Sequence, residues 1–203
     1  MRGSPRGAMA DAGRVIAGLA AGRRLAAPPG EGTRPLADRV KQTLFAILEP
    51  DLDGASVLDL FAGSGAAGIE ALSRGAASAV FVERDGRASK TIADNLRTTG
   101  LASTAAVVTA DALTWLRRPA TVDGPRFDVV VIDPPYAETE LLAAVLAELG
   151  AAHAPLVPAA RVVAKHFWRD RPPEQIGLLA SERERRFGET ALTFYRRTAE
   201  EVG

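Results

Sequence analysis

The 203-residue chain contains no cysteine and only two histidines, His153 and His166. The lack of cysteine excludes disulfides, thiolate metal ligands and a cysteine nucleophile. Two histidines are too few for a histidine-rich metal site, so we expect no metal and read both as surface or partly packed residues. A chain without thiols also fits the cytoplasm, which is the location we expect.

Long apolar runs are missing as well. No segment approaches the roughly 18 apolar residues of a membrane span, so we expect no membrane contact. The opening MRGSPRGAMADAG has no apolar core of the kind found in secretory signals, and we interpret residues 1–12 as a disordered arm or an expression leader. The apolar content of 47% and charged content of 25% are those of an ordinary globular protein.

The net charge is zero, but it is unevenly distributed. Residues 1–41 carry eight Lys/Arg against three acids, residues 42–160 carry eight against fifteen, and residues 161–197 carry nine against five. Basic ends around an acidic middle indicate a polyanionic partner. A solvated, arginine-rich surface would give the same pattern, and charge alone leaves both interpretations open.

The first 50 residues predict a small extension. Residues 14–32 look like short extended segments with glycine turns, which predicts a hairpin. A helix follows, capped at Thr33 or Asp38 and ended by Pro50. Its apolar positions keep helical spacing: Val40, Leu44, Phe45 and Leu48. We therefore divide the chain into a basic N-terminal extension over 13–50 and a main domain over 51–199.

Strands and helices alternate from residue 57 onward. The patterns predict strands at 57–61, 79–83, 105–110, 127–133, 160–167 and 189–197, and helices at 65–75, 86–100, 111–118 and 137–150. Near-continuous Val/Ile strands alternating with helices are typical of a parallel sheet covered on both faces. Ligands of such sheets bind beyond the carboxyl ends of the strands, so the residues just after each strand are the candidates for a site.

A glycine-rich turn follows the first of these strands, in DLFAGSG. Gly63 and Gly65 permit a tight turn and close approach of a ligand to bare backbone, and the next helix offers free N–H groups. Together with Gly68 they match the G-x-G-x-x-G dinucleotide fingerprint, which is weak by itself. The alternative is a plain strand-to-helix turn.

Acids follow the second and third strands. Glu83 could accept hydrogen bonds from both ribose hydroxyls of a nucleoside, or be a surface acid. Asp111 and Ala112 stand where an adenine amino group would be met, although Asp111 could equally cap the helix that follows it.

The fourth strand ends in Asp-Pro-Pro-Tyr. The two prolines stop the strand and stiffen the chain. Asp133 and the carbonyl of Pro134 supply two acceptors, and Tyr136 supplies an aromatic face. These groups would form a slot for a flat ring that carries an amino group. The alternative is a rigid turn capped by the acid.

VLDLFAGSG together with DPPY resembles the class I methyltransferases that use S-adenosylmethionine to methylate exocyclic amines of nucleic-acid bases. Further segments resemble the bacterial small-subunit (16S) ribosomal RNA guanine-N2 methyltransferase family, over about Arg14 to Arg197: RVIAG, GRRL, GTRP, DRVKQTLF, GIEALSRGA, FVERD and RFGETALTFYRR. Two positions depart from that family, which usually has a hydroxyl residue at Leu36 and an acid within Ala164-Lys165-His166.

The resemblance implies a Rossmann-like class I fold, with a mostly parallel seven-stranded sheet, helices on both faces and a small N-terminal hairpin-plus-helix extension. It implies S-adenosyl-L-methionine as cofactor and S-adenosyl-L-homocysteine as product. The implied cofactor-binding residues are Asp59, Phe61, Ala62, Gly63, Gly65, Glu83, Arg84, Asp111 and Ala112. Within this set, Asp59 and the glycines would line the methionine end, Glu83 the ribose, and Asp111 with Ala112 the adenine.

The implied catalytic residues are Asp133, Pro134, Pro135 and Tyr136. Asp133 and the Pro134 carbonyl would hold the guanine N2 amine, and Tyr136 would stack on the base. The partner implied is 16S rRNA or the small ribosomal subunit. Phosphate contacts would come from the basic extension: Arg14, Arg23, Arg24, Arg34, Arg39 and Lys41. We expect a monomer, and we interpret Trp115 and Trp168 as packing residues.

Three other functions remain open at this point. A nicotinamide-dependent oxidoreductase would explain the glycine motif but would not explain the DPPY motif. An amine methyltransferase acting on DNA adenine-N6 or on a protein glutamine would share the DPPY motif. A catalytically inactive RNA-binding module is the third, and the intact Asp133, Gly63 and Glu83 argue against it.

Overall fold

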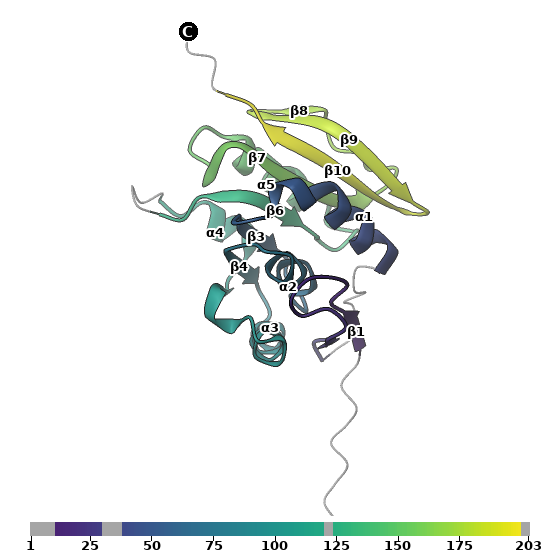
Figure 1. Ribbon diagram of the computed structural model, residues 1–203. Helices are drawn as coiled ribbons and strands as arrows, with labels where there is room; N and C mark the ends of the chain where they lie inside the picture. Colours follow the sequence, from purple (N-terminus) through teal and green to yellow (C-terminus); the bar gives the residue numbers. More distant parts are fainter. Residues whose placement is uncertain (1–10, 30–37, 120–123, 200–203) are drawn as a thin grey trace, which may run out of the picture.

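A computed structural model of the chain describes residues 11–29, 38–119 and 124–199 (Figure 1). Its main sheet has eight strands in the order β5-β4-β3-β6-β7-β10-β9-β8. The first five of these run parallel: β5 (Ala105–Thr109), β4 (Ser78–Glu83), β3 (Ser56–Leu60), β6 (Phe127–Ile132) and β7 (Leu156–Phe167). Three antiparallel strands complete it: β10 (Thr190–Arg197), β9 (Leu179–Phe187) and β8 (Gln175–Ile176).

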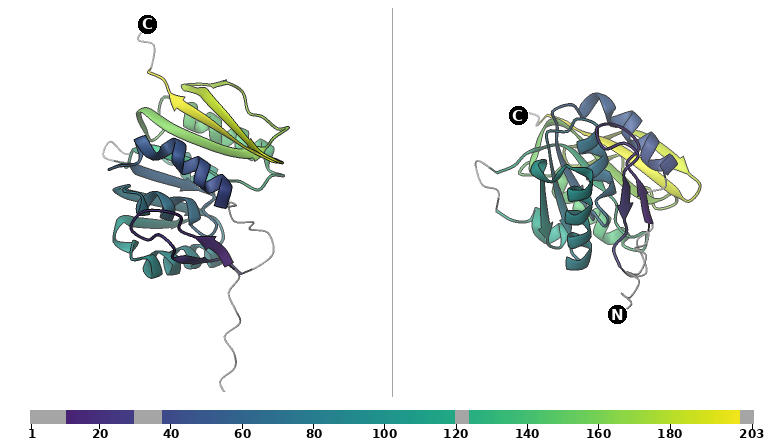
Figure 2. Two further views of the ribbon diagram at one scale, coloured as in Figure 1. Left: turned by 45° about the vertical axis from the view of Figure 1, so that its right-hand side comes forward. Right: turned by 60° about the horizontal axis from the view of Figure 1, so that its bottom comes forward.

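Helices cover both faces of this sheet (Figure 2). The α-helices are α1 (Asp38–Leu48), α2 (Ala66–Ser73), α3 (Gly86–Thr99), α4 (Ala112–Leu116) and α5 (Thr139–Gly150), and η1 (Glu49–Asp51) and η2 (Ala102–Thr104) are short 3-10 turns. The predicted α/β fold with a mostly parallel sheet is confirmed. The helix predicted to end at Pro50 ends at Leu48 and continues as η1, because proline fits the first turn of a helix.

The sheet has eight strands among the described residues rather than the seven expected. β9 escaped the sequence analysis because its sequence, LASERERRF, is rich in charge and four of its residues are exposed. A strand near the edge of a sheet needs little apolar surface, so its pairing with β10 is not visible in the hydrophobic pattern.

The N-terminal extension contains the predicted hairpin, formed by β1 (Asp11–Arg14) and β2 (Arg24–Ala26). β1 begins at Asp11, so the last two residues assigned to the arm over 1–12 belong to the hairpin, because Asp11 pairs with Ala26. Residues 1–10 lie outside the described residues, as does Thr33, one of the two predicted caps of α1.

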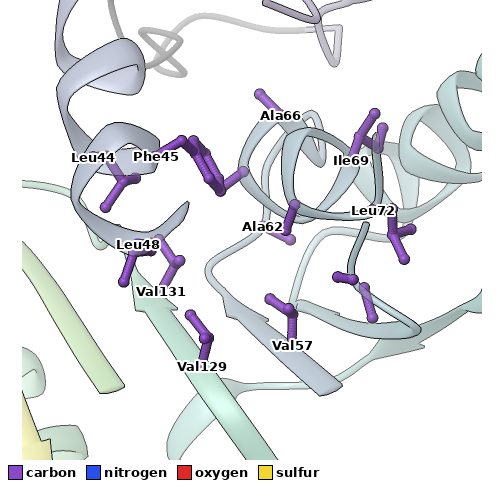
Figure 3. Close-up of a cluster of buried hydrophobic side chains, with 14 of the residues drawn as sticks. Leu44, Phe45, Leu48, Val57, Ala62, Ala66, Ile69, Leu72, Val129 and Val131 are labelled. Atoms are coloured by element: carbon purple, nitrogen blue, oxygen red, sulfur yellow. The ribbon is translucent and has the colours of Figure 1, made fainter. Parts of the chain in front are cut away.

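The extension is built into the core of the main domain. Figure 3 shows Leu44, Phe45 and Leu48 of α1 against side chains from β3, β6 and α2. All three α1 side chains are fully buried, and each contributes roughly 2 kcal/mol through burial. The second core layer lies on the other face of the sheet, under α4 and α5.

A buried ion pair fastens the extension to α2. The Glu70 carboxylate accepts hydrogen bonds from the backbone N–H groups of Ile16 (2.7 Å) and Ala17 (3.1 Å). It also pairs with Lys41 of α1 (3.5 Å) and with Arg74 (2.8 Å). Four groups from three segments therefore meet on one carboxylate that is closed to solvent.

The prediction that Lys41 contacts RNA is wrong in this structure. Its side chain is 1% exposed, and its ammonium donates to the carbonyl of Arg14 as well as pairing with Glu70. Burial lowers the pKa of Lys41, and the Glu70 carboxylate opposes that shift. The helical spacing that placed Val40 and Leu44 inside also turns Lys41 inward.

Replacing Lys41 with alanine should lower the free energy of unfolding by about 3 kcal/mol, because Glu70 would keep its buried charge with one cation fewer. Urea denaturation measures the loss. Arg39→Ala, an exposed cation on the same helix, is the control and should change stability by less than about 0.5 kcal/mol. Equal effects of the two substitutions would contradict the role given to the buried pair.

Candidate functional site

The carboxyl ends of β3, β4, β5 and β6 meet at one edge of the sheet and border a cavity of about 810 Å³. The chain order reverses between β3 and β6, which is where sheets of this kind bind ligands. The predicted residues that line the cavity are Asp59, Phe61, Ala62, Gly63, Glu83, Arg84, Asp111, Ala112, Asp133, Pro134, Pro135 and Tyr136. Such a volume is in the usual range for small-molecule sites.

Gly65 is the one residue of the cofactor and catalytic sets that does not line the cavity. Gly65 is the N-cap of α2, and its backbone has a φ of 78°, in the left-handed region. A Cβ there would come within 3.1 Å of the Ile92 side chain. Gly65 therefore shapes the turn, and Gly63, also at positive φ, faces the cavity.

Glu83 joins two of the loops that border the cavity. One carboxylate oxygen accepts from the N–H of Gly63 (2.9 Å), and the other accepts from the N–H of Asp85 (2.9 Å). The side chain is half-buried and lines the cavity, so it is more than a surface acid. Its contact with a ribose stays a prediction.

Asp59 is a buried acid at the floor of the site. Its side chain is 1% exposed and accepts a hydrogen bond from the N–H of Gly68 (2.8 Å). Burial raises the pKa of Asp59 to about 8; the Gly68 hydrogen bond opposes this shift, and the carboxylates of Asp133 and Glu83 add to it. Asp59 is therefore mostly protonated at neutral pH.

Asp111 serves as the N-cap of α4, as the alternative interpretation predicted. Its carboxylate accepts from the N–H of Thr114 (2.8 Å), and this hydrogen bond lowers the pKa of Asp111. Asp111 also lines the cavity, so a contact with a ligand remains compatible with capping. Arg84 and Glu138 both line the cavity and form an ion pair at 3.2 Å.

Asp133 follows β6 and forms an ion pair with Lys165 of β7. The Lys165 ammonium also lies 4.9 Å from the centre of the Tyr136 ring. Burial raises the pKa of Asp133, and Lys165 opposes that shift. The Tyr136 hydroxyl hydrogen-bonds Thr190 at 2.5 Å, while the ring remains 40% exposed.

Sequence reasoning noted Lys165 only as a departure from a family pattern and missed its place beside Asp133. The signal was available in the strand register. Ile132 pairs with Ala164 across the parallel strands β6 and β7, so the residues that follow each of them are neighbours on the same face.

The extension supplies part of the cavity wall through residues that the sequence analysis did not select: Ala12, Ala27, Pro28 and Pro29. Of the predicted phosphate-binding cations, Arg14 and Arg24 are exposed but face Asp38 (3.9 Å) and Asp11 (3.7 Å). Arg23 and Arg39 are exposed as well. Arg34 lies outside the described residues.

The remaining candidates are structural. His166 is buried and hydrogen-bonds the Thr193 hydroxyl at 2.8 Å, and His153 is exposed beside Glu148. Trp115 packs against Phe127, as expected of a packing residue. Within residues 11–29, 38–119 and 124–199, no group of acids and histidines is arranged to hold a metal. None of the helices described there is long and apolar enough to cross a membrane.

The sheet order, the glycine turn and the acids at the strand ends define a class I methyltransferase fold. A solved structure described as "Putative methyltransferase yhhF from Escherichia coli" superposes with a TM-score of 0.81 at 35% identity, covering 92% of this chain and 98% of that one. The chain belongs to the family described as "Conserved hypothetical protein 95", whose model matches residues 13–196.

Two named relatives illustrate the family. "Putative rRNA methyltransferase YlbH" of Bacillus subtilis is 40% identical over 91% of this chain and 98% of its own length. "Ribosomal RNA small subunit methyltransferase D" of Haemophilus influenzae is 44% identical over 61% of this chain and 63% of its own length. The family resemblance read from the motifs is confirmed, and the nicotinamide alternative loses its basis.

The raised pKa of Asp59 predicts a pH-dependent stability. The unfolded chain ionises Asp59 near its ordinary pKa of 3.8, whereas the folded protein keeps the proton until about pH 8. Stability from this group is therefore complete below pH 4 and is lost as the pH rises through 8. Between pH 5 and 7.5 the loss should reach at most about 3 kcal/mol.

Asp59→Asn keeps an acceptor for Gly68 and removes the ionisation. Denaturation of both proteins across this pH range should show the wild type losing stability relative to the variant as pH rises. Parallel pH profiles would mean that Asp59 is ionised in the folded protein.

Proposed function

We propose that the protein transfers a methyl group from S-adenosyl-L-methionine to the exocyclic N2 of a guanine in 16S rRNA, within a small-subunit particle. The observation that carries this proposal is the position of Asp133-Pro134-Pro135-Tyr136. The motif lines the same cavity as the glycine turn and Glu83. Relatives described as ribosomal RNA methyltransferases support the RNA substrate.

The charge of the cavity suits a positively charged cofactor. Among the acids that line it, Asp85 pairs with Arg87, and Asp133 with Lys165. Within the described residues Asp59 has no ion pair; burial raises its pKa, and the carboxylates of Asp133 and Glu83 add to that shift. A cation bound here would offset the contribution of those carboxylates. S-adenosylmethionine supplies a methyl group on a cationic sulfonium, which is an excellent leaving group.

The residues around the cavity fit the other parts of this cofactor. Glu83 keeps carboxylate lone pairs for ribose hydroxyls while it fixes the Gly63 loop. Asp111 and Ala112 lie at the end of β5, where the adenine would be held. The bare backbone at Gly63 allows the methionine portion to approach closely.

The acid and the proline carbonyl would act on the substrate amine. The lone pair of guanine N2 is delocalised into the ring, so the amine is a poor nucleophile. Hydrogen bonds from its N–H groups to Asp133 and to the Pro134 carbonyl would orient the nitrogen toward the methyl group. They would also stabilise the positive charge that develops on nitrogen, and the exposed Tyr136 ring would stack on the base.

Asp133 forms an ion pair with Lys165 at the position where the substrate amine would bind. The Lys165 ammonium contacts both the Asp133 carboxylate and the Tyr136 ring, the same two groups assigned to the amine and the base. The incoming guanine must therefore share the carboxylate with Lys165 or move the lysine aside. In either case Lys165 favours the ionised acid, which is the form that accepts hydrogen bonds from an amine.

Replacing Asp133 with alanine should lower the turnover number at least 100-fold while leaving cofactor affinity within about twofold, because the acid orients the amine and not the cofactor. The assay uses tritiated S-adenosylmethionine with unmodified small ribosomal subunits, naked 16S rRNA and DNA, followed by identification of the labelled nucleoside. Asp94→Ala, a partly exposed acid on α3, is the matched control.

The labelled product distinguishes the alternatives. N2-methylguanosine from small subunits supports the proposal. Label in N6-methyladenine keeps the amine site but changes the substrate. Label in protein alone moves the substrate to a glutamine side chain.

Lys165→Met should move the acidic limb of the pH–rate profile to higher pH. Lys165 lowers the pKa of Asp133, so its removal raises that pKa, and the ionised acid appears only at higher pH. Lys90→Met, an exposed lysine on α3, should leave the limb in place. A profile that does not move would show that ionisation of Asp133 does not limit the reaction.

A further inference from the structure

Two arginines gather around a tryptophan at the turn of the β9–β10 hairpin. The guanidinium of Arg186 lies 3.6 Å from the centre of the Trp168 ring, and that of Arg169 lies 5.0 Å from it. Arg186 also donates to the carbonyl of Gly188 (2.9 Å). Trp168 is half-buried, and both arginines are exposed. The ring therefore packs against one guanidinium at the surface.

The arginines of this region differ in their partners from Arg14 and Arg24 of the N-terminal extension. Arg14 and Arg24 each face a carboxylate. Within the described part of the chain, Arg169 and Arg186 form no ion pair, and neither do Arg183 and Arg185 on the same strand β9. Among the described residues, unpaired positive charge is therefore densest on and beside the hairpin, whereas in the extension it is limited to Arg23 and Arg39.

The cluster lies at the same edge of the sheet as the cavity. Phe167, the last residue of β7, pairs with Thr190, the first of β10, and β7 runs parallel to β6. The backbone N–H of Trp168 donates to the carbonyl of Glu189. The hydroxyl of the next residue, Thr190, hydrogen-bonds the Tyr136 hydroxyl. The hairpin of β9 and β10, yellow in Figure 1, turns at this edge.

We propose that Arg186 and Arg169, positioned by the Trp168 ring, form a phosphate-binding site for the RNA strand that continues from the methylated guanine. This inference rests on the proposed function, because it assigns the surface to the RNA substrate of the same cavity. A planar guanidinium with free N–H donors binds phosphate oxygens in a bidentate manner. The stacked ring reduces the conformational freedom that Arg186 would otherwise lose on binding.

The adjacent aromatic residues support a path for the strand. A small hollow next to the cavity is lined by Tyr136 and by Phe167, the residue that precedes Trp168. The Phe167 and Trp168 rings lie 6.3 Å apart. A base stacked on Tyr136 would therefore leave its flanking phosphate near the uncompensated guanidinium groups.

The test measures binding of unmodified 16S rRNA transcript to Arg186→Ala, Arg169→Ala and Trp168→Leu at several salt concentrations. Each arginine variant should raise the dissociation constant about tenfold and reduce the slope of log K against log salt by about one. Trp168→Leu should weaken binding as Arg186→Ala does, and Trp168→Phe should restore it. Arg126→Ala is the matched control, because Arg126 is exposed just before β6, at the far edge of the sheet.

Affinity for S-adenosylmethionine and the thermal midpoint should stay at wild-type values in the arginine variants. Arginine variants that bind RNA like Arg126→Ala, with an unchanged salt slope, would overturn the inference, even if the wild type methylates RNA. Hairpin-dependent RNA binding by a wild type that forms no methylguanosine would keep the inference and refute the proposed function.

Discussion

The parallel pairing of β3, β4, β5 and β6 is the constraint on which the site depends. Parallel strands place all their carboxyl ends at one edge, so residues more than 70 positions apart in sequence come to border one cavity. The backbone N–H of Gly63 donates there to the side chain of Glu83, from the next strand. The short segments after the strands thus form the site, while the side chains of the strands pack in the hydrophobic core.

The electrostatics of the cavity follow from this convergence. Asp59, Glu83 and Asp133 come from different strands and meet in a partly buried space, where burial raises the pKa of Asp59 and the other two carboxylates add to that shift. Two features reduce the negative charge there: Asp59 is mostly protonated at neutral pH, and Lys165 pairs with Asp133. The remaining imbalance favours a cationic ligand, and this links the sheet topology to the chemistry proposed for the site.

The two ends of the chain frame the cavity in different ways. The extension is held by the buried Glu70 carboxylate and contributes apolar wall residues such as Ala27 and Pro29. The β9–β10 hairpin contributes Thr190 to the position of Tyr136 and presents arginines without carboxylate partners. The first therefore forms part of the cavity wall, and the second carries the surface proposed to bind RNA.

The sequence by itself determined the α/β class, the order of the strands from residue 57 to 133 and the residues at their ends. These features depend on local signals: runs of Val and Ile, glycines at tight turns, and prolines that stop a strand. The DPPY and glycine motifs were found for the same reason, since each is contiguous in the chain.

Only the tertiary structure decided which charges face solvent and which acids share a space. Lys41 and Arg39 look equivalent in sequence, yet one is buried against Glu70 and the other is exposed. The register of β6 and β7 places Lys165 beside Asp133, and the charged strand β9 is stabilised by its pairing with β10. Helical spacing turns Lys41 inward, but only Glu70 from a distant helix compensates its buried charge, and the other two depend on pairing between distant strands that no local pattern encodes.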